Sequence, residues 1–549
     1  MSAPAFAELA ADQRVRTHEF PARRGAILDR NGEPLAISID LKTIYADPAL
    51  VENARSEAEK LAPVLDLDVD AATELLNGRT PESRFEFIAR QVPPKVAKKV
   101  AALELPGVHM YEEARRYYPG GRLASHILGF TDTDGNGISG IESEYEHLLK
   151  GKAGRETLEQ DPAGNSLPQA DSTYEAPRPG HSLFLTIDKD IQYFTELTLT
   201  QATKQYGAIG GTAIVMKPDT GEILALANVP DFSPNRPGDF ATEAFRNRAV
   251  TDVYEPGSAF KIVTASAALE QGLVTPETSF LVPDALAYYD RVFNDSHAHA
   301  TMPMTVSEII EQSSNVGTIK IALNLGAKLL DQFVYAFGFG AETGLGFPGE
   351  SSGILLDRKD WSGTTIATVP IGQGIAVTPM QMALAYCVLA NDGEWIAPRL
   401  LASTMDERGD VDVPPSPPAR TVISAETATT MSEILARVVE KGTGIEAQIP
   451  GYAVAGKTGT AQKASPEGGY GNSYVASFAG FAPADDPAIV VLVVLDEPTP
   501  IWGGSTAAPT FKLITEFTLR HLGIAPTENA EKAAAELEAE MAGDPAIHD

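Results

Sequence analysis

The chain contains very little cysteine and few basic residues. Cys387 is the single cysteine in 549 residues, so neither an intrachain disulfide nor a cysteine metal site can form, and its apolar surroundings predict a core position. Lys and Arg number 43 against 74 Asp and Glu, which gives a formal net charge of −31. This balance argues against a nucleic-acid partner, because phosphate binding needs a basic surface.

Long apolar runs and phosphate-binding loops are missing as well. No run of 18 or more apolar residues occurs, and the longest apolar stretch, residues 488–495, has the length of a core strand. No glycine-rich phosphate loop is present, so no nucleotide cofactor is expected. His297 and His299 share one side of an extended segment but have no third ligand in view, so we expect no metal site and no cofactor.

The first part of the chain opens with a predicted β-hairpin. Within residues 23–38, Asn31-Gly32 stands between two apolar runs, and this dipeptide favours a type I′ turn with positive φ at both central residues. Residues 1–22 form a lead-in to the hairpin. Up to residue 181, helical and extended patterns alternate without a plausible catalytic cluster. Residues 160–181 are rich in Pro, Gly, Ser and acidic residues, which predicts a linker.

The second part, residues 182–525, has strands at both ends and helices between them, which predicts one α/β domain with a central, largely antiparallel sheet. Its first strand is predicted at residues 182–188. The tail, residues 526–549, is acidic and is expected to be disordered. The other predicted elements are a helix over 189–206, a hairpin over 211–228, strands over 452–462, 473–483 and 488–498, and a helix over 508–522.

Residues 255–261, with the sequence EPGSAFK, predict a helix start that carries a nucleophile and a base. Ser258 and Lys261 are three residues apart, so both side chains lie on one face of the first turns. A serine hydroxyl needs a base to attack a carbonyl, and a lysine can take its proton only when burial or a neighbouring cation keeps the amine neutral.

Two further short motifs follow along the chain. Ser313 and Asn315 form a Ser-x-Asn pattern, but Ser233 and Asn235 form a second one, and either could be simple turn chemistry. The segment Lys457-Thr458-Gly459-Thr460 lies in a predicted strand, so Thr458 and Thr460 point the same way. A glycine within a strand often marks the close approach of a ligand backbone.

Ser-x-x-Lys, Ser-x-Asn and Lys-Thr-Gly, in this order, form the signature of serine penicillin-recognising enzymes. Over residues 20–520 the chain resembles a class B penicillin-binding protein, a monofunctional peptidoglycan D,D-transpeptidase, and most resembles the septal, cell-division member. The segments RRGAILDRNGEPLA, RYYPGG, GISGIE and NRAVTDVYEPGS carry the rest of this resemblance.

The resemblance implies an α+β multidomain fold. Residues 23–181 would form an N-terminal mixed α/β pedestal of the dimerisation type. Residues 182–525 would form the penicillin-binding transpeptidase domain, with a central, largely antiparallel sheet flanked by helices. The family carries an N-terminal transmembrane helix just before the hairpin, and this sequence does not contain one, so residues 1–22 are expected to be the remnant beside a missing anchor.

The resemblance also assigns roles to the motif residues. Ser258 would be the acylated nucleophile and Lys261 its base. Ser313 would relay a proton to the leaving D-alanine, and Asn315 would orient the substrate amide. Lys457 would tune the electrostatics. The strand residues expected to bind the substrate's terminal carboxylate region are Thr458, Gly459 and Thr460, and the backbone N–H groups of Ser258 and Thr460 would form the oxyanion hole.

The expected substrates are peptidoglycan stem peptides on lipid-linked glycan strands, at the extracytoplasmic face of the cell membrane, with β-lactams as inhibitors. A membrane glycan polymerase and other division proteins are the expected partners. An elongation-type or specialised class B paralogue is the alternative within the family. A β-lactamase or carboxypeptidase would share the motifs but not the pedestal. The alternative from another class is a non-catalytic division scaffold or β-lactam sensor.

Overall fold

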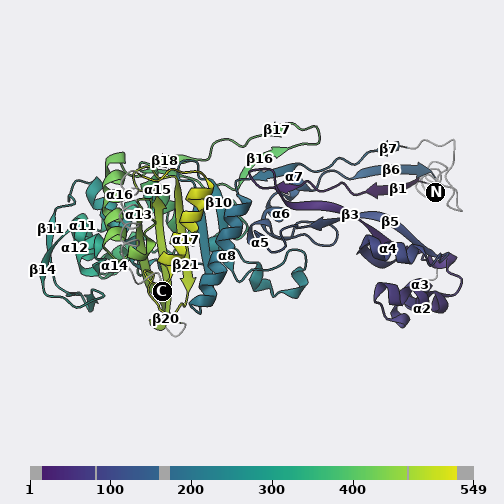
Figure 1. Ribbon diagram of the computed structural model, residues 1–549, viewed down its shortest axis with the longest axis horizontal. Coiled ribbons are helices and arrows are strands. Elements are labelled where there is room, and N and C mark those ends of the chain that lie inside the picture. The colour runs from purple at the N-terminus through teal and green to yellow at the C-terminus, as the bar shows by residue number, and fades with distance from the viewer. Residues whose placement is uncertain (1–14, 81–82, 160–172, 466–468, 528–549) are drawn as a thin grey trace, which may run out of the picture.

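The computed structural model describes residues 15–80, 83–159, 173–465 and 469–527. The molecule is elongated: a broad C-terminal body carries the largest group of helices, and the N-terminal part extends from it as a long arm (Figure 1). Of the helices in these residues, none is both long and apolar enough to cross a membrane. The acidic tail beyond residue 527 lies outside the described residues, as does most of the predicted linker.

An antiparallel five-stranded sheet forms the centre of the broad body, in the order β10-β9-β21-β20-β19. This confirms the hairpin and the three later strands predicted from the sequence. Its strands are β9 (Gly210–Met216), β10 (Ile223–Val229), β19 (Ala455–Ala464), β20 (Tyr470–Ala482) and β21 (Ile489–Asp496). β19 is an edge strand, so one of its sides is free of sheet pairing.

Helices cover both faces of this sheet, which explains the unbroken apolar run of β21. Val491 and Val493 pack on one face with residues of α8 and α17, whereas Val490 and Leu492 belong to the core on the other face. The single cysteine, Cys387, is buried in that second core, as predicted. The helices are α8 (Lys189–Gln205) and α17 (Ala507–His521) on the first face, and α10 (Lys261–Glu270), α15 (Pro379–Ala390) and α16 (Ala425–Glu440) on the second.

The predicted N-terminal hairpin is confirmed, but its turn differs from the predicted type. β2 (Ile27–Leu28) pairs antiparallel with β3 (Pro34–Ala46). Gly32 has a φ of 84°, whereas Asn31 has no positive φ, so the turn is not type I′. The Gly32 N–H donates to the Asp29 carbonyl at 3.1 Å, and the Asp29 carboxylate accepts the N–H groups of Asn31 and Glu33 at 2.8 Å. These bonds fit a three-residue loop closed by a glycine bulge.

The strand predicted at residues 182–188 does not join the five-stranded sheet. The strand itself, β8 (Ser182–Leu185), is shorter than predicted, and it pairs parallel with β2 of the hairpin and antiparallel with β16 (Leu401–Met405). A second, seven-stranded sheet therefore connects the N-terminal arm to the broad body. Its other strands are β3, β4 (Glu86–Val92), β5 (Val108–Tyr117) and β17 (Val411–Asp412).

The far end of the arm holds a small sheet and a helical lobe (Figure 1). Residues 15–20 of the predicted lead-in form a strand, β1, which pairs with β6. The lobe has its own apolar core. The remaining elements of the arm are η1 (Pro48–Leu50), α2 (Ala54–Leu65), α3 (Val69–Asn77), α4 (Pro94–Ala101), α5 (Ser125–Leu128), α6 (Gly140–Glu144), α7 (Glu146–Leu149), β6 (Gly154–Glu159) and β7 (Thr173–Glu175).

A buried ionic cluster joins three N-terminal segments that carry the family resemblance. Glu142, from GISGIE, is fully buried and accepts bonds from Arg24 Nε and Arg116 Nε, both at 2.6 Å. Arg24 belongs to the segment RRGAILDRNGEPLA, and Arg116 is the arginine of RYYPGG. Removing one member of such a cluster would leave a buried charge without its partner, which is strongly destabilising. These residues therefore serve the fold of the arm.

Candidate active site

The nucleophile candidate lies in a tightly held turn. Ser258 belongs to a 3₁₀ turn over Gly257–Phe260 that leads directly into α10. The Gly257 N–H donates to the Gly372 carbonyl at 3.1 Å, and a Cβ on Gly372 would lie 2.2 Å from the Gly257 oxygen. Ser258 is partly exposed. Among the residues the structure describes, nothing is hydrogen-bonded to its hydroxyl, which leaves this hydroxyl open to a ligand.

Lys261 lies one turn further along, fully buried. Its Nζ donates to the Ser313 carbonyl at 2.5 Å and lies 3.3 Å from Ser313 Oγ. Burial and the positive charge of Lys457 lower the pKa of Lys261, and the negative charge of Asp295 opposes this. No ion pair to Lys261 exists in the described part of the chain. The site therefore favours a neutral amine here, which is what a base for a serine requires.

The structure distinguishes the two Ser-x-Asn segments. Ser313 reaches Lys261, and the backbone of Ser313 has a φ of 58°, a strained value of the kind that gathers at functional sites. Asn315 begins α12 (Asn315–Leu325) and donates from Nδ2 to the Asn294 carbonyl at 2.9 Å. Asn235, in contrast, bonds both backbone groups of Tyr118 in the N-terminal arm, so the segment at Ser233 has a structural role.

Lys457 is the second fully buried lysine. Its Nζ donates to the hydroxyls of Thr443 and Thr458, both at 3.3 Å, and these two hydroxyls lie 2.8 Å apart. Burial lowers the pKa of Lys457 to about 7. The lysine therefore carries a charge that can change near neutral pH, on the same strand whose Gly459 contacts the nucleophile turn.

Gly459 allows β19 and the nucleophile turn to touch. A Cβ at Gly459 would lie 2.3 Å from Ser477 Oγ and 2.9 Å from the Pro256 carbonyl. Thr460, on the next position, accepts the Gly503 N–H at 3.1 Å. β19 therefore runs along the turn that holds Ser258, and the approach of a ligand backbone at Gly459 stays a prediction.

Sequence reasoning missed several residues that hold this site. Asp295 accepts hydrogen bonds from the Ser314 hydroxyl at 2.7 Å and from the Val316 N–H at 2.9 Å, so it holds the Ser-x-Asn turn in place. His299 Nε2 donates to the same carboxylate at 3.0 Å. Trp502, next to the Gly503 that bonds Thr460, is 47 % exposed at the edge of the site. None of these residues belongs to a recognisable motif, although His299 shares an extended segment with His297.

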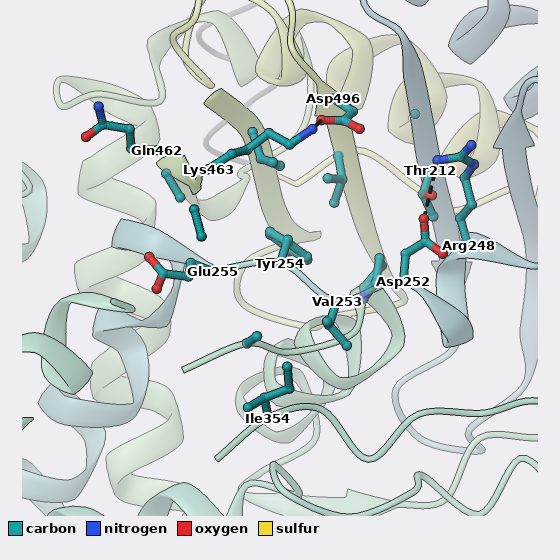
Figure 2. Close-up of a pocket in the computed structure, with 17 residues that line it drawn as sticks. Thr212, Arg248, Asp252, Val253, Tyr254, Glu255, Ile354, Gln462, Lys463 and Asp496 are labelled. Carbon is teal, nitrogen blue, oxygen red and sulfur yellow. Dashed lines mark hydrogen bonds and ion pairs between the residues drawn. The ribbon is translucent and has the colours of Figure 1, made fainter. Parts of the chain in front are cut away.

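A pocket of about 470 Å³ adjoins the site (Figure 2). Glu255 and Gln462 lie on one side of it and the Arg248–Asp252 pair on the other, with Lys463 directed at Asp496. Ser258 and the two buried lysines do not line it. The pocket is therefore separate from the nucleophile and the two lysines, although Glu255 and Gln462 connect it to the same chain segments.

Comparison with known proteins agrees with the sequence motifs. Residues 211–516 match the penicillin-binding protein transpeptidase domain, and residues 19–185 match the penicillin-binding protein dimerisation domain. The chain is 36 % identical to the peptidoglycan D,D-transpeptidase FtsI of Escherichia coli K12, over 93 % of this chain and 86 % of that protein. It is 35 % identical to the penicillin-binding protein PbpB of Mycobacterium tuberculosis, over 93 % of this chain and 80 % of that protein.

Solved structures show the same relationship. The crystal structure of penicillin-binding protein 3 from Mycobacterium tuberculosis in complex with aztreonam has a TM-score of 0.73 and 31 % identity, over 93 % of this chain and 98 % of that one. A peptidoglycan synthetase from Bifidobacterium adolescentis has a TM-score of 0.78 and 30 % identity, over 94 % and 98 %. The expected α+β fold, a dimerisation module followed by a transpeptidase domain, is confirmed, and the chain belongs to the penicillin-binding protein transpeptidase family.

Proposed function

We propose that this protein is a serine-type peptidoglycan D,D-transpeptidase that cross-links stem peptides through an acyl-enzyme on Ser258. One observation carries the proposal. Three chain segments spread over about 200 residues bring an unbonded serine hydroxyl, a buried lysine that favours its neutral form, and a second buried lysine to one site. Relatives named peptidoglycan D,D-transpeptidase and a related structure with aztreonam support the same reaction.

In the acylation step, Ser258 Oγ attacks the carbonyl carbon of the penultimate D-alanine. The O–C bond forms as the neutral Lys261 amine takes the hydroxyl proton. The tetrahedral intermediate then collapses, and the C–N bond to the terminal D-alanine breaks. Ser313, whose Oγ lies 3.3 Å from Lys261 Nζ, passes a proton from Lys261 to the leaving nitrogen.

In the second step, the amine of another stem peptide attacks the ester carbonyl. A new C–N bond forms, the amine loses its proton through the same pair, and Ser258 Oγ leaves with a proton returned by Lys261. A β-lactam enters by the first step, and its ring-opened acyl group stays on Ser258. No cofactor takes part in this scheme.

Substrate binding is assigned to β19 and the Ser-x-Asn turn. Because β19 is an edge strand, a peptide can pair along its free side. The hydroxyls of Thr458 and Thr460 would bind the terminal carboxylate, with Gly459 leaving space, and Lys457 would supply the attracting charge. Asn315 would hold the substrate amide. The N–H groups of Ser258 and Thr460 would bind the oxyanion.

The biological setting is a finer proposal. We assign residues 23–181 to a pedestal and residues 182–525 to the catalytic domain, with β8 linking them by its pairing to β2. The protein would act at the septum, on the extracytoplasmic face of the membrane, on lipid-linked glycan strands made by a partner polymerase. Similarity to FtsI over most of the chain supports this. Depletion in the source organism tests it: filamentous cells support a septal role, and rounded cells an elongation role.

The chemistry is tested by intact-mass spectrometry after incubation with penicillin. The wild-type chain should gain one acyl adduct, and Ser258→Ala should gain none while it unfolds at the same temperature. A control change in the other Ser-x-Asn segment, Ser233→Ala, should leave the adduct in place. An adduct on folded Ser258→Ala would refute the nucleophile assignment.

A further inference from the structure

The pocket lined by Glu255 and Gln462 continues the row of side chains assigned to substrate binding. Along β19, residues two apart point the same way, so Gln462 follows Thr458 and Thr460 on one face. Gln462 lines the pocket together with Glu255 (Figure 2). Glu255 precedes the nucleophile by three residues, and the turn after it contacts β19, because a Cβ on Gly257 would lie 2.9 Å from the Thr460 carbonyl. A peptide bound along β19 would reach this wall.

The charges of the pocket leave one carboxylate without a cation. Arg248 pairs with Asp252 at 3.3 Å, and Lys463 pairs with Asp496 at 2.7 Å. Glu255 receives only neutral donors: the Gly374 N–H at 2.9 Å and the Tyr470 hydroxyl at 3.0 Å. Across the described ranges, no lysine, arginine or histidine forms an ion pair with Glu255. Burial raises the pKa of Glu255, as expected for a carboxylate that has lost water without gaining a cation.

We propose that Glu255 forms a subsite for a primary ammonium group of a stem peptide. The proposal rests on the transpeptidase function above. Cross-linking joins a carbonyl of one stem peptide to an amine of another, so each stem peptide carries a free amine until it is cross-linked. An ammonium at Glu255 would complete the charge balance of the pocket, three residues from Ser258. The amine belongs either to the donor already placed along β19 or to the incoming acceptor.

Two kinetic arms distinguish these sources in the full chain. The donor arm compares acylation by Nα-acetyl-L-lysyl-D-alanyl-D-alanine, which has a free side-chain amine, with its Nε-acetylated form. The acceptor arm uses the fully acetylated donor and measures how the acyl-enzyme divides between hydrolysis and aminolysis by a lysine-bearing peptide. A charged hydrogen bond of this kind corresponds to at least about a tenfold preference. The variant is Glu255→Gln, and Glu433→Gln, an exposed carboxylate on α16, is the matched control.

In the donor arm, wild type and Glu433→Gln should be acylated about tenfold faster by the peptide with the free amine than by its acetylated form. A fall of this preference to about onefold in Glu255→Gln supports the donor amine. A fall in the aminolysis fraction confined to Glu255→Gln supports the acceptor amine. If neither quantity differs between Glu255→Gln and wild type, the subsite is refuted. Should Glu255→Gln fail to fold, the wild-type preference must still decrease as salt screens the pair, and a salt-independent preference refutes the proposal. Wild-type protein that penicillin does not label would refute the transpeptidase function itself.

Discussion

Lys457→Met should stabilise the protein while it reduces activity. Lys457 is fully buried, and its Nζ bonds only two threonine hydroxyls, both at 3.3 Å. The described residues place no carboxylate in ion-pair range of it. Holding a positive charge here is unfavourable, which is why burial lowers its pKa from an ordinary 10.5 to about 7. Methionine has a similar length and flexibility without the charge.

The size of the effect follows from the pKa. Each tenfold change in proton affinity corresponds to about 1.4 kcal/mol, so a pKa near 7 instead of 10.5 costs the folded state about 5 kcal/mol when the lysine is charged. Methionine also removes two hydrogen bonds, which contribute about 1 kcal/mol each. The free energy of unfolding of Lys457→Met should therefore exceed that of wild type by about 3 kcal/mol at pH 7.

The sign of the pH dependence is fixed by linkage. The pKa of Lys457 is lower in the folded state, so between pH 7 and 10.5 the unfolded state binds more protons, and wild-type stability rises with pH. The cost is fully present below the folded pKa and disappears above the unfolded one. The advantage of Lys457→Met should accordingly be largest at pH 7 and below, and should decrease toward pH 10.

Urea unfolding of the full-length wild type and of Lys457→Met measures this difference in stability. The relevant transition is the one in which the protein loses its ability to be labelled by penicillin. The control is Lys328→Met, which removes an exposed lysine and should leave the midpoint unchanged. Lys457→Met should also slow acylation by penicillin, because the attracting charge is lost. A midpoint at pH 7 equal to or below that of wild type would refute the reasoning, and so would an advantage that does not decrease at higher pH.

Three further outcomes are expected. Lys261→Arg keeps a cation but removes the base, so acylation should fall by at least about 100-fold in stopped-flow assays, and a loss below tenfold would contradict the role. Asp295→Asn removes the carboxylate that raises the pKa of Lys261, so the pH at which the acylation rate begins to rise should move downward. The free energy of unfolding should also fall by about 2 kcal/mol, because the hydrogen bonds to this carboxylate are weakened. An unchanged pH profile of acylation would show that Asp295 has a structural role and does not affect Lys261. A fragment of residues 182–523 keeps the five-stranded sheet, but β8 loses its pairing partner β2. The fragment should therefore still bind penicillin and should unfold at a lower temperature than the full chain. A folded fragment that penicillin does not label would show that the N-terminal module contributes to the site.

The sequence predicted the parts of the fold that depend on local patterns. The apolar run of β21 predicts a strand, and the glycine between β9 and β10 predicts a turn. Both signals are local and do not depend on the position of the rest of the chain. The partner of β8 could not be predicted in this way. Its pairing with β2 is parallel and joins Ile27 to Leu183, 156 positions apart, and no local pattern encodes such a partner. The turn at Asn31 also differs, because the Asp29 carboxylate collects two N–H groups that a type I′ turn would direct elsewhere.

Sequence order predicted the motif residues of the site but not the groups that support them. Ser313 and the two lysines carry recognisable spacing, and the structure brings them together. Asp295 and Thr443 are single loop residues outside any motif. Asp295 supports the site by accepting the Ser314 hydroxyl, and Thr443 does so by accepting a hydrogen bond from Lys457. Such contacts arise from tertiary packing, so a single sequence does not reveal them.

The geometry around Lys261 explains why this lysine, and not Lys457, suits the role of base. A neutral amine has two N–H donors and one lone pair, whereas an ammonium has three donors and none. Lys261 Nζ has two acceptors in place, the carbonyl and the hydroxyl of Ser313, which use both donors of the neutral form. Its lone pair then remains available for the Ser258 proton. Lys457 also faces two oxygens, but both are threonine hydroxyls, and no hydrogen bond within the described residues joins Lys457 to Ser313. Its charge therefore acts at a distance: it lowers the pKa of Lys261 and favours the neutral base.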